Sequence, residues 1–204
     1  MNNQTNRLFY RRLAPYYDYV IGNRWFSRVR RRLFSLVSFQ PEDRVLLAGV
    51  GTGLDIPYIP PEVHLTGIDI TPNMLDKARL KAKNRPLNLL PMNAESLSFP
   101  DDSFHYVGLN LILSVVEHPD LALSEAIRVL KPEGKLLVFD KFLPSHQETT
   151  WKRRILNHLT RRMGTDITRS WEDLSQGLPL ETVVDETHLF HYRLLILKKK
   201  KISH

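Results

Sequence analysis

The fold is decided by the stretch Arg44-Val-Leu-Leu-Ala-Gly49-Val-Gly51-Thr-Gly53. Its first half is an apolar run that predicts a buried β-strand, and its second half is a glycine-rich turn. Glycine has no Cβ, so the chain can reverse there and a ligand can lie against bare backbone. A glycine turn placed directly after a buried strand therefore predicts a ligand-binding α/β fold.

The spacing of these glycines bears on the kind of ligand. It is G-x-G-x-G, whereas the dinucleotide fingerprint is G-x-G-x-x-G, and Leu54 follows the last glycine. The next segment, residues 55–61, contains three prolines and is not expected to begin a regular helix. Because no helix N-terminus is then available for a pyrophosphate, the turn favours a nucleoside without phosphates.

Polar side chains follow the next two predicted strands. A strand over Val63–Ile68 ends at Asp69, where a carboxylate in a doubly wound sheet accepts hydrogen bonds from both ribose hydroxyls. A strand over Leu87–Met92 leads into Asn93 and Ala94, where the Asn93 carbonyl and the Ala94 amide would face an adenine edge. The alternative for Asn93 is a turn or capping role. Together with the glycine turn, Asp69 predicts an adenosine-type ligand.

The rest of the chain alternates strands with helices. We expect helices at 72–85 and 120–130, strands at 106–109 and 135–140, a helix stop at 131–134, and an antiparallel pair at 181–185 and 192–197. The alternation predicts a doubly wound, mostly parallel α/β sheet. No second core is visible, so we predict one domain over 1–204, with an N-terminal helical cap at 1–40 and a helical lid insertion at 145–178.

Composition and charge exclude several classes of function. The chain has 204 residues, a net charge of +7 and no cysteine, which excludes disulfides, thiol nucleophiles and cysteine-ligated metals; no metal site is expected. No apolar run approaches the roughly 20 residues of a membrane span, so we expect a soluble, cytoplasmic protein. Residues 1–40 hold eight arginines and one acid. Such a basic flank indicates either contact with an anionic surface or plain solubility.

Four motifs follow one another along the chain. They are Gly49-Val-Gly-Thr-Gly53, Gly67-Ile-Asp69-Ile-Thr-Pro-Asn-Met74-Leu, Asn93-Ala-Glu95 and Arg128-Val-Leu-Lys-Pro-Glu-Gly134. Together they resemble the motifs of class I S-adenosylmethionine-dependent methyltransferases. The resemblance implies a Rossmann-like, seven-stranded sheet with an antiparallel last hairpin, and S-adenosylmethionine as the cofactor.

The resemblance also implies the residues that contact the cofactor. Outside the N-terminus they are Gly49, Gly51, Thr52, Gly53, Asp69, Ile70, Met74, Asn93, Ala94 and Asn110. Asp69 would bind the ribose, Ile70 would flank the adenine, and Asn93 takes the place of the usual Asp while keeping an acceptor. Leu47 stands where many members have an acid that helps to order the methionine amino group, so this contact is in doubt.

The segment Tyr10-Arg-Arg-Leu-Ala-Pro-Tyr-Tyr17-Asp18 resembles the opening of two subfamilies. These are the quinone-biosynthesis C-methyltransferases and the bacterial phosphatidylethanolamine N-methyltransferases. In such enzymes the N-terminal tyrosine region folds over the cofactor, which makes Tyr10, Tyr16 and Tyr17 expected contacts. The alternative is that these tyrosines are hydrophobic staples.

Three residues are candidates for catalysis, namely Tyr17, His118 and Asp140. Methyl transfer needs position and desolvation more than it needs a base. Asp140 would orient an amine headgroup and His118 would accept a proton near neutral pH. The alternatives are a helix-start role for His118 and a local ion pair between Asp140 and Lys141.

The acceptor is expected to lie near the segment after the fourth strand, residues 110–119. This segment lacks the Asn/Asp-Pro-Pro-aromatic motif of enzymes that methylate nucleic-acid amino groups, and no nucleic-acid partner is expected. Its Leu113-Ser-Val-Val116 resembles the phospholipid N-methyltransferases. The resemblance therefore implies a lipid or small-molecule acceptor.

Two basic amphipathic helices are predicted, at 24–37 and 151–163. A basic helix with aromatic residues is typical of a helix that lies in an anionic membrane interface. The alternative is that both apolar faces pack on the domain as a lid, and the two roles are compatible.

These features predict a methyltransferase that N-methylates a phospholipid headgroup, with phosphatidylethanolamine as the lead, at the inner face of the membrane. One alternative is a C- or O-methyltransferase of quinone or small-molecule metabolism. The other is an RNA- or membrane-binding module with a vestigial cofactor pocket. The sequence leaves open the acceptor atom, the number of methyl groups and the oligomeric state.

Overall fold

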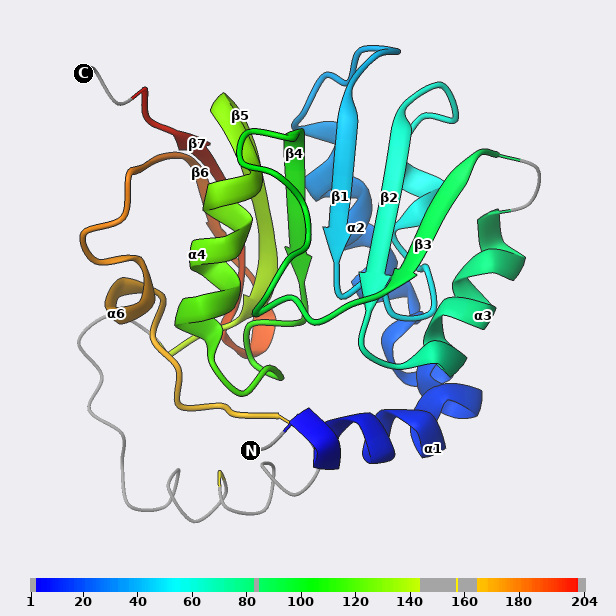
Figure 1. The fold of residues 1–204 in the computed structure, drawn as a ribbon. Coiled ribbons are helices and arrows are strands. Elements are labelled where there is room, and N and C mark those ends of the chain that lie inside the picture. Colours follow the sequence, from blue (N-terminus) through cyan, green and yellow to red (C-terminus); the bar gives the residue numbers. More distant parts are fainter. Residues whose placement is uncertain (1–2, 83–84, 144–156, 158–164, 202–204) are drawn as a thin grey trace.

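The computed structural model describes residues 3–82, 85–143, 157 and 165–201 (Figure 1). Seven strands form one sheet in the order β3-β2-β1-β4-β5-β7-β6. They are β1 (Arg44–Ala48), β2 (His64–Asp69), β3 (Leu87–Pro91), β4 (Phe104–Asn110), β5 (Leu130–Lys141), β6 (Leu180–Thr187) and β7 (Tyr192–Lys199). Strand β7 is antiparallel to β5 and β6, and the other neighbouring pairs are parallel. The predicted sheet is confirmed.

Helices cover both faces of this sheet and one of its ends. They are α1 (Asn3–Ile21), α2 (Arg24–Ser35), α3 (Pro72–Ala82), α4 (Pro119–Val129) and α6 (Trp171–Ser175), with short 3₁₀ turns η1 (Ile56–Tyr58) and η2 (Leu189–His191). The core residues of α4 and α6 pack against one face of the sheet, and those of α2 and α3 against the other. Helix α1 runs across the carboxyl ends of β1 and β2 (Figure 1), where ligands bind in open α/β sheets.

The prediction for the start of β5 is wrong. The sequence predicts a helix stop at 131–134 and a strand only from Lys135, but β5 already begins at Leu130, which pairs with Phe104. The register shifts before Tyr106 pairs with Lys135, so the intervening residues bulge, and Glu133 adopts a left-handed φ of 67°. The fully buried Leu130 side chain holds this extension of the strand in the core.

The residues after the glycine turn form only the 3₁₀ turn η1, as the prolines there predict. Helix α3 begins at Pro72, the expected first position, and its described part ends at Ala82. The bounds of the other helix and of the remaining strands agree with the predictions to within three residues. Most of the predicted insertion at 145–178, including the basic helix at 151–163, lies outside the described residues.

Helix α2 packs its apolar side on the sheet. Asn23 caps the helix, because its side chain accepts hydrogen bonds from the amides of Trp25 and Phe26. The rings of Trp25 and Phe26 contact Phe139 of β5 and Tyr192 of β7, with centroid separations of 4.8–6.2 Å in this group. The packing weighed as one of the two compatible roles of this helix is therefore present, and its contact with a membrane stays a prediction. Its polar side remains exposed.

No helix in the described part of the chain is long and apolar enough to cross a bilayer.

Candidate functional site

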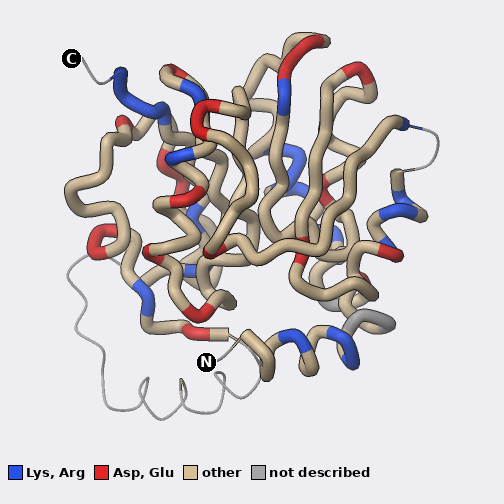
Figure 2. The backbone as a smooth tube through the Cα atoms, in the orientation of Figure 1, with Lys and Arg blue, Asp and Glu red and all other residues tan. Residues whose placement is uncertain are grey.

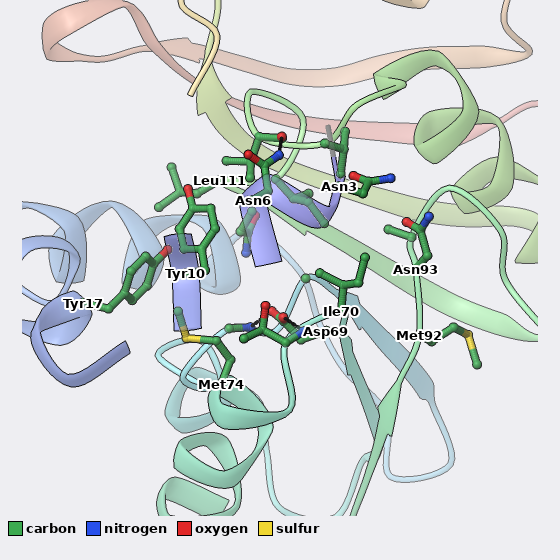
Figure 3. A pocket seen from close by; sticks show the side chains of 18 residues that line it. Asn3, Asn6, Tyr10, Tyr17, Asp69, Ile70, Met74, Met92, Asn93 and Leu111 are labelled. Atoms are coloured by element: carbon green, nitrogen blue, oxygen red, sulfur yellow. Dashed lines mark hydrogen bonds between the residues drawn. The ribbon is translucent and has the colours of Figure 1, made fainter. Parts of the chain in front are cut away.

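A pocket of about 690 Å³, its mouth included, lies between α1 and the carboxyl ends of the strands (Figure 3). We call it the first pocket. Its lining is Asn3, Asn6, Tyr10 and Tyr17 from α1; Gly49 and Gly51 from the glycine turn; Asp69, Ile70, Thr71 and Met74; Met92, Asn93 and Ala94; and Asn110, Leu111, Ile112, Val115 and Val116. Predicted contacts from three of the four motifs, from the end of β4 and from the N-terminal helix are thus brought together around one cavity.

The glycine turn forms the floor of this pocket because its backbone is left-handed. Gly49 has a φ of 79° and Gly51 a φ of 54°, a region that residues with a Cβ rarely adopt. A Cβ on Gly51 would meet nothing closer than the Tyr17 ring at 4.0 Å, so the backbone there is open to a ligand. A Cβ on Gly49 would lie 2.4 Å from Ile112 Cδ1.

Asp69 links this turn to the end of β2. Its Oδ2 accepts a hydrogen bond from the Gly51 amide at 3.0 Å, and its Oδ1 accepts one from the Thr71 amide at 2.8 Å. Burial raises the pKa of Asp69 to about 6, although both backbone bonds oppose the shift. The carboxylate keeps unused acceptor capacity toward the pocket, where ribose hydroxyls are predicted to bind.

Asn93 and Met92 lie at one end of the first pocket, and Tyr10 and Tyr17 at the other, with Asp69 and Ile70 between them (Figure 3). The Asn93 carbonyl oxygen accepts a hydrogen bond from the Glu95 amide at 3.0 Å, which is the turn role weighed as its alternative. The residue also lines the pocket, so its contact with an adenine edge stays a prediction.

Three predicted contacts do not line the first pocket. The Thr52 hydroxyl donates to Asp18 and so ties the glycine turn to α1, while the ion pair of Asp18 with Lys81 at 2.6 Å ties α1 to α3. A Cβ on Gly53 would lie 2.9 Å from Ala78 Cα, so this glycine allows α3 to approach the turn. Tyr16 is 71% exposed. The motif spacing could not separate contacts with a ligand from contacts within the scaffold.

A second pocket, of about 1010 Å³ with its mouth, adjoins the first. Both pockets are lined by Tyr10, Tyr17, Leu111 and Val115, which form a shared wall. The rest of the second lining is Phe9, Leu13, Ile21, Ser114, Asp140, Lys141, Thr165, Ile167 and Tyr192. A group bound in one pocket therefore lies next to a group bound in the other.

The charged groups of the second pocket lie at the end of β5. Asp140 is fully buried and accepts hydrogen bonds from the amides of Ser114 at 3.0 Å and Lys141 at 2.7 Å. Burial raises the pKa of Asp140 and lowers the pKa of Lys141. The Lys141 ammonium lies 5.1 Å from the centre of the Tyr192 ring, a cation–π contact. This arrangement places one cation and one neighbouring carboxyl group in a cavity whose other lining residues are mostly apolar or aromatic.

The three candidates for catalysis are not brought together. Tyr17 and Asp140 line the second pocket, whereas His118 lines neither pocket, and its side chain is 56% exposed beside Glu117. Burial raises the pKa of Tyr17, and it raises the pKa of Tyr10 to about 12. Both phenols are therefore protonated hydrogen-bond donors at neutral pH rather than bases.

Sequence reasoning missed the residues that hold α1 over the first pocket. The Asn3 side chain donates to Glu95 Oε2 at 3.0 Å, and its backbone amide donates to Glu117 Oε2 at 2.9 Å. The buried Asn6 side chain donates to the Val115 carbonyl at 2.7 Å. These two asparagines belong to no recognisable sequence motif. Only their contacts with residues far away in the chain show that they hold α1 over the pocket.

The described residues fit the nucleoside cofactor implied by the resemblance. The volume lies in the range of about 300–1,000 Å³ that is usual for small-molecule sites. Asp69 supplies an anionic acceptor for hydroxyl groups, and Gly51 exposes bare backbone. The Asn110 Oδ1 atom is buried without a hydrogen-bond partner among the described residues, so it can accept from a ligand.

Binding of S-adenosylhomocysteine is expected to depend on pH through Asp69. The pKa of about 6 applies to the ligand-free protein, and hydroxyl donors stabilise the ionised carboxylate, so the pKa falls on binding. Affinity should be level above about pH 7 and fall by up to about tenfold per unit below pH 6. Calorimetry from pH 5 to 8 measures this, and the control is the Asp69→Asn variant, whose weaker affinity should not vary with pH over this range.

The chain resembles known proteins in sequence. A family model described as a methyltransferase domain matches residues 46–138. The chain is 36% identical over 137 residues to the phosphatidylethanolamine N-methyltransferase of Cereibacter sphaeroides, covering 65% of this chain and 66% of that protein. It is 34% identical over 146 residues to the demethylmenaquinone methyltransferase of Listeria welshimeri, covering 67% and 62%. The matches therefore span less than two thirds of the length of these curated relatives.

Solved structures share the fold. A SAM-dependent methyltransferase from Thermotoga maritima matches with a TM-score of 0.71 at 21% identity, covering 96% of this chain and all of that one. The cyclase SpnF matches with a TM-score of 0.70 at 18% identity, covering 86% and 81%. At such identities the likeness concerns the fold, and one fold supports different reactions.

The matched segment, 46–138, runs from β1 into β5 and contains the glycine turn and Asp69. The strand order with an antiparallel β7 is the one that the resemblance implies. The family match, the curated relatives and the shared fold together identify the chain as carrying a class I, S-adenosylmethionine-dependent methyltransferase domain.

Proposed function

We propose that the protein transfers a methyl group from S-adenosylmethionine to an amphiphilic acceptor in the second pocket. The observation that supports this most directly is the shared wall of Tyr10, Tyr17, Leu111 and Val115. The bound cofactor supplies an electrophilic methyl group on a sulfonium, which an acceptor attacks in line. A donor in the first pocket and an acceptor in the second would then come into direct contact beside this wall, and the methyl group would leave the sulfur as its bond to the acceptor forms.

The residues of the wall exclude water and orient the reactants. The rings of Tyr10 and Tyr17 are 6.1 Å apart in an edge-to-face arrangement, and both hydroxyls stay protonated. Leu111 and Val115 offer no competing polar group. A displacement at a methyl group depends mostly on the position and desolvation of the reactants. His118 therefore does not act as a base in this reaction.

The lead acceptor is the headgroup of phosphatidylethanolamine. Lys141 offers a cation for the phosphate, and the apolar lining suits the adjoining glycerol and acyl groups. Asp140 adds negative charge near the amine, although its oxygens already accept backbone hydrogen bonds. The relative from Cereibacter sphaeroides carries this activity in its name.

Exposed arginines favour presentation of such an acceptor at an anionic membrane surface. Exposed arginines on α1 are Arg7, Arg11 and Arg12, and those on α2 are Arg24, Arg28 and Arg31. Basic stretches along α1 are coloured blue in Figure 2. Each cation near an anionic leaflet contributes about 1 kcal/mol. Because the apolar side of α2 is buried, contact through this helix is electrostatic, without insertion of its apolar residues.

The second candidate function is methylation of a quinol or another small aromatic acceptor. The aromatic residues Phe9, Tyr10, Tyr17 and Tyr192 in the second pocket favour a flat ring. The name of the relative from Listeria welshimeri points the same way. This reaction would not require Lys141.

Lys141→Met is expected to separate the two acceptors. The wild-type protein is assayed for tritiated methyl transfer to phosphatidylethanolamine in anionic vesicles and to demethylated quinols. Loss of a cation that binds phosphate should lower transfer to the lipid by about tenfold or more. Transfer to quinols should change by less than about threefold, since it involves no charged partner for Lys141.

The control is Lys135→Met on the same strand, far from the carboxyl end, which should leave both reactions unchanged. Flotation of the vesicles at low and high salt reports the surface contact separately, because exposed charges are screened by salt. Transfer to quinols alone, without vesicle binding at low salt, would reject the lipid proposal. S-adenosylhomocysteine binding without transfer to any acceptor would favour the vestigial module.

A further inference from the structure

A buried polar network joins three elements beside the first pocket. Asp55, just after the glycine turn, accepts hydrogen bonds from Arg30 Nε of α2 and from Asn110 Nδ2 at the end of β4, each at 2.8 Å. Arg30 also donates to the Ile21 carbonyl at 2.9 Å. Arg30, Asp55 and Asn110 are only 4%, 8% and 8% exposed. A buried ion pair with such close contacts holds all three side chains in place.

This network decides which way the Asn110 amide faces. A carboxylate can only accept, so the Asn110 amino group must face Asp55, and its carbonyl oxygen faces the other way. The Oδ1 atom is buried and has no partner among the described residues. Leaving a buried acceptor unpaired is costly, and because Asn110 lines the first pocket, a donor on the ligand there is within reach.

The position of Asn110 indicates which part of the ligand carries this donor. Leu111, the next residue, lies beside Tyr10, away from Asn93 and Met92 (Figure 3). With the adenine at Asn93 and the ribose at Asp69, the amino-acid end of the cofactor reaches the Asn110 side. The side chain of Leu47, which stands where many relatives have an acid for the amino group, is buried in the core and has no polar atom, so it cannot bind that group. A carbonyl oxygen is a suitable acceptor for an ammonium group.

We propose that Asp55, held by Arg30, is a positioning residue that turns the Asn110 carbonyl toward the ammonium group of the cofactor. The inference rests on the assignment of S-adenosylmethionine to the first pocket and goes beyond it by naming the groups that recognise its amino-acid end. It concerns binding alone, so it is independent of the methyl acceptor.

The test compares two ligands by calorimetry, S-adenosylhomocysteine and methylthioadenosine, which has the same nucleoside but lacks the amino-acid end. Asn110→Leu should weaken the binding of S-adenosylhomocysteine by about 10- to 100-fold, which is the effect of losing one hydrogen bond to a charged group. The affinity of the same variant for methylthioadenosine should change by less than about threefold. Asp55→Asn should show the same selectivity with a smaller loss, because a neutral partner lets the Asn110 amide turn over.

Two controls keep the outcomes distinct. Asp69→Asn should weaken the binding of both ligands, since both carry the ribose. Asp76 is exposed, so Asp76→Asn should leave the binding of both ligands unchanged. Ligand-free thermal unfolding shows whether each variant folds, and if Asp55→Asn does not, Asn110→Leu alone decides. An equal loss for both ligands, or no loss, in Asn110→Leu would overturn the inference. Failure of the wild-type protein to bind either ligand would instead overturn the cofactor assignment.

Discussion

Asp69→Ala is expected to weaken S-adenosylhomocysteine binding by about 100-fold or more. The change removes the anionic acceptor for two ribose hydroxyls, and a hydrogen bond to a charged group contributes about 1.5–3 kcal/mol. It also removes the acceptor of the Gly51 amide, which holds the glycine turn in its left-handed form. Calorimetry at pH 7.5, where the carboxylate of the wild-type protein is ionised, measures the loss.

Asp76→Ala is the matched control for this prediction. Asp76 is an acid on α3 whose side chain is 71% exposed and lines neither pocket, so affinity should be unchanged. If Asp69→Ala binds S-adenosylhomocysteine within about threefold of the wild-type value, the ribose does not lie at Asp69. The arrangement of the ligand in the first pocket would then have to be reversed.

Phe139→Ala is expected to produce the largest loss of stability. Phe139 is fully buried in β5, and its ring contacts Trp25 and Phe26 of α2 and Tyr192 of β7. Removing a buried phenylalanine ring costs about 3–5 kcal/mol, because apolar contacts are lost and a cavity remains. For a chain of this size the thermal midpoint should fall by about 10 °C. Calorimetric or circular-dichroism melting measures it.

The effect should extend to the second pocket, because Tyr192 both contacts Phe139 and lines that pocket. The control is Phe190→Ala in the β6–β7 hairpin, where the side chain is 79% exposed. Its free energy of unfolding should stay within about 0.5 kcal/mol of the wild-type value. A similar midpoint for both variants would show that the aromatic group does not anchor α2 to the sheet.

The two pockets differ in how much of their lining comes from the matched segment 46–138. The first pocket is lined by residues of the matched segment 46–138 and by four residues of α1, and it lies at the carboxyl ends of the strands. The second pocket is built from α1, the segment after β4, the end of β5 and residues 165 and 167. Of its lining residues, only Leu111, Ser114 and Val115 lie within the matched segment 46–138, so an acceptor bound there would mostly contact residues outside it.

The strands and the glycine turn could be predicted from the sequence because their signals are local. Apolar runs define buried strands, and three glycines with a following carboxylate define the turn. The error at Leu130 has a physical reason: the Lys-Pro-Glu-Gly segment by itself indicates a helix stop, but pairing with Phe104 extends the strand through it. Tertiary contacts override local preference there.

The roles of single side chains were harder to predict. Thr52 and Gly53 belong to the same motif as Gly51, yet they contact Asp18 and Ala78 rather than the first pocket. Asn3 and Asn6 belong to no motif, yet they line it. Whether a side chain points into the pocket depends on neighbours far away in the chain, and the spacing of residues in a motif carries no information about them.

By itself, the sequence determined the class of fold, the nucleoside character of the ligand and the acid expected to bind its ribose, because each depends on residues adjacent in the chain. Only the tertiary structure decided that two pockets share a wall, that His118 lies outside both, and that Arg30 and Asp55 orient Asn110. The physical reason is that buried polar contacts join residues 25 and 55 positions apart. Their geometry exists only once the sheet and its helices have packed.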